Sequence, residues 1–447
     1  MKEMFLLGAG ASVEAGIPNS NDMTKWMLEA FQTKPEKYAR VVSFVTGGLL
    51  FQNGIKGLNP ITSGVNVEEL FNAIDLLANR HTLEAAPFVG SWHSMIDEFD
   101  RITPPQSNAY GLHRAIYASV TKEILNALPN SAPPFGDSEI ERALQHAITQ
   151  ANNSHSSSSY MFREASRAIG QYVVKFTNNW MQKLRRSPMP STDVERAFKD
   201  ATNRISKPGQ GQIFDNVAEY MIRSLANIVW IDNVEKVQYL APLLDSLRDE
   251  QKLTIATLNY DNTIELLTNS KQIFYSTGLE SWLNTGSFGK IDNGVLLLKL
   301  HGSIDWELKD GSCDEKRPLP YKTIERVSEE QVKKAGFRPA VIFGHKNKLT
   351  ANGPFLEILQ TFQKELDSAD RLTIIGYSFG DNHINIYISN WLNQNQNHTI
   401  RVIDPYFDKN SNKFVRQLRQ IKPQRLEVIE KNASEGLKML SPTTNES

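Results

Sequence analysis

Cysteine is almost absent from this sequence, since Cys313 is the only one among 447 residues. A single cysteine excludes an intramolecular disulfide and any cysteine-rich zinc ribbon within one chain. The sequence also lacks an excess of charge, because 49 Lys and Arg residues stand against 50 Asp and Glu residues. That balance removes the whole-chain electrostatic argument for nucleic-acid binding, so we expect no direct contact with nucleic acid.

Long hydrophobic runs are missing as well. No stretch reaches the length needed to span a bilayer, so we expect no membrane insertion. The apolar run at residues 4–7 is too short for a signal-peptide core, and it leads into glycines rather than a cleavage site. We therefore expect a cytoplasmic protein.

The two ends of the chain predict an α/β fold. Apolar runs typical of buried strands lie at residues 2–8, 253–257, 295–300, 340–343, 372–376 and 400–403. Helices are expected from about residue 21, over 261–267, over 354–366 and after Asp381. Strands that alternate with helices imply right-handed crossovers and a parallel sheet. We therefore predict a Rossmann-like parallel sheet with helices on both faces.

The middle of the chain has helical periodicity instead. Two apolar stripes consist of Leu112, Ile116, Val120 and Ile124, and of Val217, Met221, Leu225 and Ile228. We predict a large all-helical insertion at residues 85–245. It would interrupt a Rossmann-like domain made of residues 1–84 and 246–435, with a C-terminal tail at 436–447. Core packing explains the stripes, so they support no functional role.

Glycines directly follow the first predicted strand, in the segment Gly8-Ala9-Gly10-Ala11-Ser12. Glycines let the backbone approach a diphosphate, and the N–H groups at the start of the next helix attract its charge. The usual dinucleotide fingerprint would place a third glycine where Val13 stands, which weakens a hydride-transfer dehydrogenase interpretation. A tight strand-to-helix turn without a ligand is the alternative.

Polar residues follow the next two strands. Asn259 and Asp261 come after the strand at 253–257, and His301 follows the strand at 295–300. Ligands of open parallel sheets bind outside the carboxyl ends of the strands. The Asn259 amide can donate and accept, and Asp261 can accept from a hydroxyl. A histidine, whose unperturbed pKa is about 6.5, can take a proton near neutral pH. Helix capping is the alternative for Asn259 and Asp261.

Two later strands end in the same way. Gly376 and Ser378 follow the strand at 372–376, where glycine permits a second close backbone approach, to the adenosine half of a dinucleotide. Asp404 follows the strand at 400–403, and a carboxylate there can accept from ribose hydroxyls. A surface turn before Pro405 is the alternative for Asp404.

Taken in order, these motifs resemble those of the sirtuin superfamily. The motifs are Gly8-Ala9-Gly10-Ala11-Ser12 with Gly16-Ile17-Pro18, then Asn259-Tyr260-Asp261, His301-Gly302 and Gly376-Tyr377-Ser378. They are most similar to the bacterial sirtuin-like branch, whose members act as NAD-depleting effectors in antiphage defence. The resemblance covers the two ends of the chain and leaves the helical middle unmatched.

The resemblance implies a site as well as a fold. The diphosphate would lie near the first glycines, the nicotinamide ribose near Asn259 and Asp261, and the adenosine ribose near Ser378, with His301 as general base. The candidate catalytic residues are His301 and Asn259, and the candidate NAD-binding residues are Gly8, Ala9, Gly10, Ser12, Asp261, Gly376, Ser378 and Asp404. NAD+ would be the substrate, with no prosthetic group and no metal.

Two features depart from the family pattern. Deacylating sirtuins carry a four-cysteine zinc module that one cysteine cannot build, so we expect neither zinc nor protein deacylation. After Pro18 the family continues with an acid, Phe and Arg, whereas residues 19–22 here are Asn-Ser-Asn-Asp. This difference leaves open which residue closes the loop over the nicotinamide.

The sequence therefore predicts an NAD+ hydrolase that releases nicotinamide and ADP-ribose, and that depletes cellular NAD in antiphage defence by abortive infection. An ADP-ribosyltransferase or cyclase on the same fold, and a non-catalytic module that senses NAD or ADP-ribose, are the alternatives. An unregulated NAD hydrolase would poison its host. We therefore expect control by homo-oligomerisation or by a partner protein, such as the HerA-type ATPase with which some relatives work.

Overall fold

The computed structural model describes residues 2–59, 64–80, 212–248, 251–279, 291–311, 321–332, 339–342, 354–409 and 412–440, with isolated positions between them. The chain divides into two compact units, one formed by residues 1–73 and 218–447 and the other by residues 74–217. The predicted stripe at 112–124 lies outside the described residues. The sheet and the cavity discussed below belong to the first unit.

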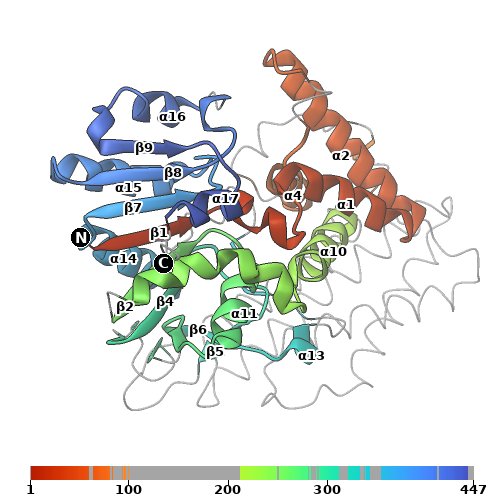
Figure 1. Ribbon diagram of the computed structural model, residues 1–447. Helices are drawn as coiled ribbons and strands as arrows, with labels where there is room; N and C mark the ends of the chain where they lie inside the picture. The colour runs from red at the N-terminus through yellow and green to blue at the C-terminus, as the bar shows by residue number, and fades with distance from the viewer. Residues whose placement is uncertain are drawn as a thin grey trace, which may run out of the picture. The chain divides into compact units, whose positions relative to one another are not determined.

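A seven-stranded sheet forms the centre of this unit (Figure 1). Its strands are β1 (Glu3–Leu7), β2 (Lys252–Thr257), β3 (Tyr275–Ser276), β4 (Gly294–Lys299), β7 (Arg371–Ile375), β8 (Thr399–Ile403) and β9 (Leu426–Ile429). They lie in the order β3-β4-β2-β1-β7-β8-β9, and every neighbouring pair is parallel. The predicted α/β fold with a parallel sheet is thus confirmed.

The register of the sheet brings its strand ends level. Leu7 at the end of β1 pairs with Thr257 of β2 and with Ile375 of β7. Thr257 pairs in turn with Lys299 of β4, and Ile375 with Ile403 of β8. The loops that leave these strands therefore start side by side at one edge. The chain leaves β1 for β2 on one side and returns to β7 on the other, which creates the switch point where open sheets bind ligands.

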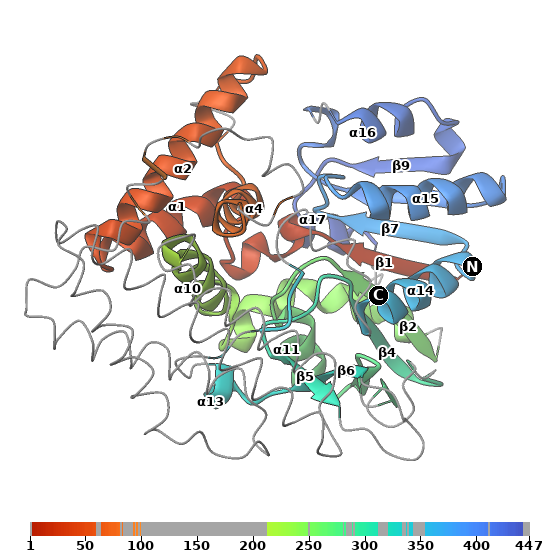
Figure 2. The same ribbon diagram turned by 180° about the vertical axis from the view of Figure 1, so that it is seen from behind.

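Helices cover both faces of the sheet, as predicted (Figures 1 and 2). One face carries α14 (Pro354–Asp367) and α15 (Asn382–Gln394), and the other carries η3 (Val234–Arg248), α11 (Thr263–Ser270) and α17 (Ala433–Lys438). Helix α14 buries its apolar stripe, which includes Phe355, Ile358, Phe362 and Leu366. Most of the 3₁₀ segment η3 lies within the range predicted as an insertion, residues 85–245, yet it contacts α11, α17 and β2.

Further helices precede β2. They are α1 (Ser20–Gln32), α2 (Glu36–Ile55), α4 (Val67–Ala78) and α10 (Gln212–Val229). Helix α1 begins where predicted, because the Asn19 side chain accepts from the backbone N–H groups of Asn21 and Asp22. Helix α10 contains the second predicted stripe, of which Val217, Met221 and Leu225 are buried.

One predicted strand is wrong. Over the described residues 339–342 there is no strand, and Val341 makes only an isolated antiparallel bridge with Gly302. A separate antiparallel pair, β5 (Trp306–Gly311) and β6 (Tyr321–Arg326), was not predicted. The remaining short elements are η1 (Ala9–Ala15), α13 (Glu329–Val332), η5 (Phe407–Lys409), α16 (Lys413–Leu418) and η6 (Pro423–Arg425).

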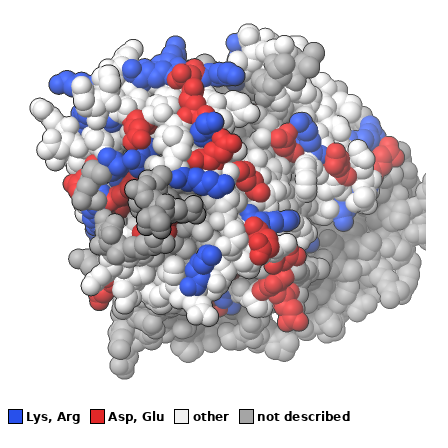
Figure 3. Space-filling model, in the orientation of Figure 1, with Lys and Arg blue, Asp and Glu red and all other residues white. Residues whose placement is uncertain are grey.

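None of the described helices combines the length and the apolar character that a bilayer crossing requires. On the face shown in Figure 3, basic and acidic side chains of the described residues are interspersed. That pattern gives this face no extended region of one sign.

Candidate functional site

A cavity of about 610 Å³ lies at the carboxyl ends of the sheet strands, a volume typical of small-molecule sites. Every candidate residue lines it: Gly8, Ala9, Gly10, Ser12, Asn259, Asp261, His301, Gly376, Ser378 and Asp404. They come from the loops after β1, β2, β4, β7 and β8. The level strand ends therefore explain why residues from both ends of the chain meet in one place.

Glycines allow the loop after β1 and the loop after β7 to contact each other through their backbones. The N–H of Gly8 donates to Ile375 O at 2.9 Å, and the N–H of Gly10 donates to Gly376 O at 2.8 Å. A Cβ on Gly8 would lie 2.6 Å from Gly376 O, and one on Gly376 would lie 2.3 Å from Ala11 N. Gly376 also has a φ of +60°, which L side chains rarely adopt. Backbone contact between the loops after β1 and β7 thus requires glycine even before a ligand is considered.

A buried hydrogen-bond chain joins the loops after β1 and β2. The Ser12 hydroxyl donates to Asp261 Oδ2 at 2.7 Å, and Asn259 Nδ2 donates to Ser12 Oγ and to Gly8 O, both at 2.9 Å. The other Asp261 oxygen, Oδ1, accepts from the backbone N–H and the hydroxyl of Thr263. Asp261 Oδ1 thus accepts from Thr263, the first residue of α11, whose N-cap residue is Asn262. These hydrogen bonds fix the orientation of the Asn259 amide.

A buried ion pair contacts the backbone of the loop after β2. Lys299, the last residue of β4, is fully buried, and its Nζ lies 2.7 Å from Glu265 Oε1 and donates to the backbone oxygen of Asp261. Burial raises the pKa of Glu265, and the charge of Lys299 acts in the opposite direction. The ammonium thus ties the end of β4 to the turn that carries Asn259 and Asp261.

His301 enters the cavity from the loop after β4. Its backbone oxygen accepts from Ile342 N at 2.8 Å, and Gly302 beside it has a φ of +81°. The imidazole is buried among rings, 6.3 Å from the Tyr260 ring and 5.9 Å from the His383 ring. Because His301 and Asn259 line the same cavity, the structure brings the two candidate catalytic residues together.

The cavity wall carries negative charge. Its described lining includes Glu68, Asp261, Asp381 and Asp404, and no Lys or Arg occurs among those lining residues. Burial, followed by the charges of Glu68 and Asp381, raises the pKa of Tyr260 well above its ordinary value. Burial likewise raises the pKa of Asp404. Such a wall favours a ligand group with positive charge.

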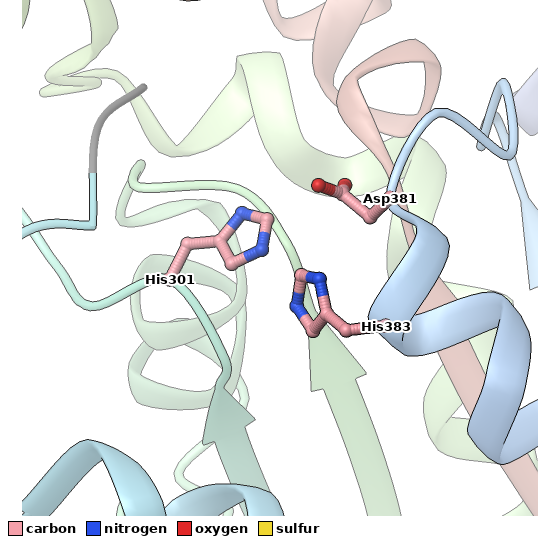
Figure 4. A group of neighbouring side chains, drawn as sticks. All are labelled: His301, Asp381 and His383. Atoms are coloured by element: carbon pink, nitrogen blue, oxygen red, sulfur yellow. The ribbon is translucent and has the colours of Figure 1, made fainter. Parts of the chain in front are cut away.

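Sequence reasoning missed several residues at this site. Glu68, Tyr377, Asp381 and Tyr406 line the cavity, and His383 lies beside His301 (Figure 4). Glu68 belongs to α4, which no motif connected with the sheet. Asp381 and His383 did carry a signal, because a carboxylate and an imidazole two residues apart follow the Gly376 turn.

Comparison with known proteins assigns part of the chain to a family. Residues 253–426 match the family model described as SIR2-like domain, which shows a SIR2-like domain from β2 to the start of β9. The match includes Asn259, Asp261, His301, Gly376, Ser378 and Asp404, whereas residues 8–12 lie outside it. No curated protein matches the sequence.

Several solved Sir2 structures share a distant likeness to the chain. A Sir2 homologue variant in complex with ADP-ribose is 16% identical, covers 51% of this chain and 75% of that chain, and gives a TM-score of 0.30. A complex of a Sir2 homologue with NAD is also 16% identical, with 51% and 73% covered and a TM-score of 0.30. A Sir2 protein bound to a propionylated peptide is 12% identical, with 51% and 77% covered and a TM-score of 0.28.

Proposed function

We propose that this chain is an NAD+ hydrolase, which cleaves the bond between nicotinamide and ribose. A SIR2-like domain suggests NAD-dependent activity, and residues 253–426 match that family. The observation that carries the proposal is the shared cavity: His301, Asn259 and the interlocked glycine loops all line it. An imidazole base, a fixed amide and a place for a diphosphate are the parts that hydrolysis of NAD+ requires.

The proposed position of NAD+ follows from the arrangement of the wall. The diphosphate lies against the glycine loops after β1 and β7, and the adenosine half extends toward Ser378 and Asp404. The nicotinamide ribose lies between Asn259 and His301. The positively charged nicotinamide ring then faces a wall that includes Glu68 and Asp381, and opposite charges in a partly buried site attract strongly.

The proposed reaction needs no metal. The glycosidic bond breaks, its electron pair neutralises the nicotinamide nitrogen, and a water oxygen forms the new bond to the sugar carbon through a ribosyl cation-like state. His301 takes the proton that the water loses. Both Nδ2 protons of Asn259 are used by Gly8 and Ser12, so the Asn259 Oδ1 is the atom that orients the water or a ribose hydroxyl. The products are nicotinamide, ADP-ribose and a proton.

The biological role that we propose is depletion of cellular NAD in antiphage defence, with activity held back until the chain assembles. Assembly is either with further copies of itself or with a partner of the HerA-type ATPase class. Light scattering together with NAD cleavage at increasing protein concentration tests this control. An active monomer whose specific activity does not change with concentration would contradict it.

A product assay tests the proposed activity. Purified protein is incubated with NAD+, and nicotinamide and ADP-ribose are quantified. Because general-base assistance is worth about 10²–10⁴-fold, His301→Ala should lower the rate by that factor, and Asn259→Ala should lower it as well. The matched control is His398→Ala, which also removes a buried imidazole. His398 lies outside the lining of the cavity: it stacks on Trp391, directly before β8. It should keep its turnover.

Each alternative gives a different result in the same assay. An ADP-ribosyl group on a protein identifies a transferase, and a cyclic product identifies a cyclase. NAD+ that is bound but intact after long incubation identifies a sensing module. Turnover that survives undiminished in both Asn259→Ala and His301→Ala would refute the assignment of those residues.

A further inference from the structure

Three metal-ligating side chains converge at one side of the cavity. They are His301 after β4, and Asp381 and His383 at the start of α15 (Figure 4). One ligand atom from each lies within 4.8 Å of the others, and all three side chains are buried or partly buried. Figure 4 shows the two imidazole rings turned toward each other, with the carboxylate beside them.

Backbone hydrogen bonds hold two of these residues, His301 and Asp381, in place. His301 O accepts from Ile342 N at 2.8 Å, and Asp381 N donates to the Tyr377 hydroxyl at 3.0 Å. Asp381 is the N-cap residue of α15, yet its carboxylate makes no capping hydrogen bond to that helix. An N-cap aspartate ordinarily accepts from the first turn, so this carboxylate is directed elsewhere, toward the two imidazoles.

We propose that His301, Asp381 and His383 bind a divalent transition-metal ion of the Zn²⁺ class. Two imidazoles and one carboxylate form a common three-residue zinc ligand set, with a water or another ligand in the fourth position. Bonds of 2.0–2.2 Å place neighbouring ligand atoms of a tetrahedral site about 3.3 Å apart. Separations of up to 4.8 Å reach that distance when the side chains rotate inward by modest amounts.

Local charge favours a cation at this position. Asp381 and Glu68 both line the cavity, and no Lys or Arg occurs among its described lining residues. The N-terminus of α15 opposes a cation with about half a unit of positive charge. Two carboxylates outweigh that half charge.

The metal would act on the proposed reaction through His301, and this consequence rests on the proposed function. An imidazole nitrogen that coordinates a metal cannot take a proton from water. A metal ion bound at this site should therefore inhibit NAD+ cleavage, because His301 cannot act as base while it coordinates the metal. Removal of the metal should reverse the inhibition. The cluster then makes the enzyme sensitive to free zinc, without any zinc module built from cysteine.

Metal binding is tested directly on the full chain, without reference to activity. Protein dialysed against EDTA is titrated with Co²⁺, whose visible absorption reports coordination geometry, and with Zn²⁺ in competition with a chromophoric chelator. Mutation of residues that hydrogen-bond to metal ligands typically lowers metal affinity by about 10–100-fold. His383→Ala removes a ligand itself, so it should lower metal affinity by at least about 100-fold. Asp381→Asn should also weaken binding, and Asp408→Asn, an exposed carboxylate, should not.

The outcomes separate the two proposals. Equal metal affinity in the wild type, His383→Ala and Asp381→Asn, or no Co²⁺ absorption band in the wild type, would overturn the metal site. In the second arm, added Zn²⁺ should stop nicotinamide release by the wild type, and EDTA should restore it. A protein that binds the metal through these residues but never cleaves NAD+ would refute the proposed function and leave the metal site standing.

Discussion

The contact between the glycine loops makes a quantitative prediction for Gly376→Ala. A non-glycine residue at a φ of +60° costs about 1–2 kcal/mol. The new Cβ would also lie 2.3 Å from Ala11 N and 2.6 Å from Gly10 Cα, and overpacking of this kind costs about 1–3 kcal/mol. The free energy of unfolding should therefore fall by about 2–5 kcal/mol, a large part of the 5–15 kcal/mol that domains possess. NAD+ cleavage should fall too, because the loops that line the cavity move apart.

Urea denaturation followed by tryptophan fluorescence measures this loss, with two comparison variants. Gly47→Ala lies in helix α2 with nothing near its added Cβ, and it should raise stability by about 0.5–1 kcal/mol. Gly376→Asn tolerates the positive φ better than alanine, so it isolates the steric part of the cost. A Gly376→Ala protein within about 0.5 kcal/mol of the wild type, the range of ordinary surface changes, would refute the argument.

Three further variants test other contacts of the site. Lys299→Ala leaves the Glu265 carboxylate buried without its partner, so the free energy of unfolding measured in urea should fall by about 3–5 kcal/mol. The double variant Lys299→Met with Glu265→Leu removes both charges and should restore most of that stability. Ser12→Ala removes the hydroxyl that accepts from Asn259, and should cost about 1–3 kcal/mol and slow nicotinamide release. Because burial raises the pKa of Asp404, the folded state binds its proton more tightly than the unfolded state, and ionisation of Asp404 at neutral pH opposes folding. Asp404→Asn should therefore be more stable than the wild type at pH 7, and this advantage should vanish near pH 4, about the unperturbed value for Asp, when unfolding is followed at both pH values.

Much of the fold could be predicted because its strands are short apolar runs that end at glycine or polar residues. Strands β1, β2, β4, β7 and β8 follow that rule, and the first four are buried on both faces. Strand β9 was missed because Glu427 interrupts a short edge strand, and β3 has only two residues. The residues near Val341 were mistaken for a strand because an apolar run fits a buried loop as well.

Part of the cavity lining could also be predicted, since parallel strands present their carboxyl ends at one edge, but Glu68, Asp381 and Tyr406 were missed. The contacts within it could not be predicted. Nothing in the sequence indicates that the Ser12 hydroxyl joins Asp261 to Asn259, because loops distant in sequence meet only in the fold. The approach of His383 to His301 likewise depends on where the fold places the start of α15 relative to the loop after β4.

We propose that one NAD+ molecule spans this cavity with its nicotinamide ribose between His301 and Asn259. A crystal structure of the His301→Ala variant soaked with NAD+ tests it most directly, because the slowed reaction preserves the intact dinucleotide. We expect the diphosphate against Gly8 and Gly376, with the nicotinamide end toward Asn259. NAD+ bound at another surface, or with its adenosine in the place of the nicotinamide, would contradict the account.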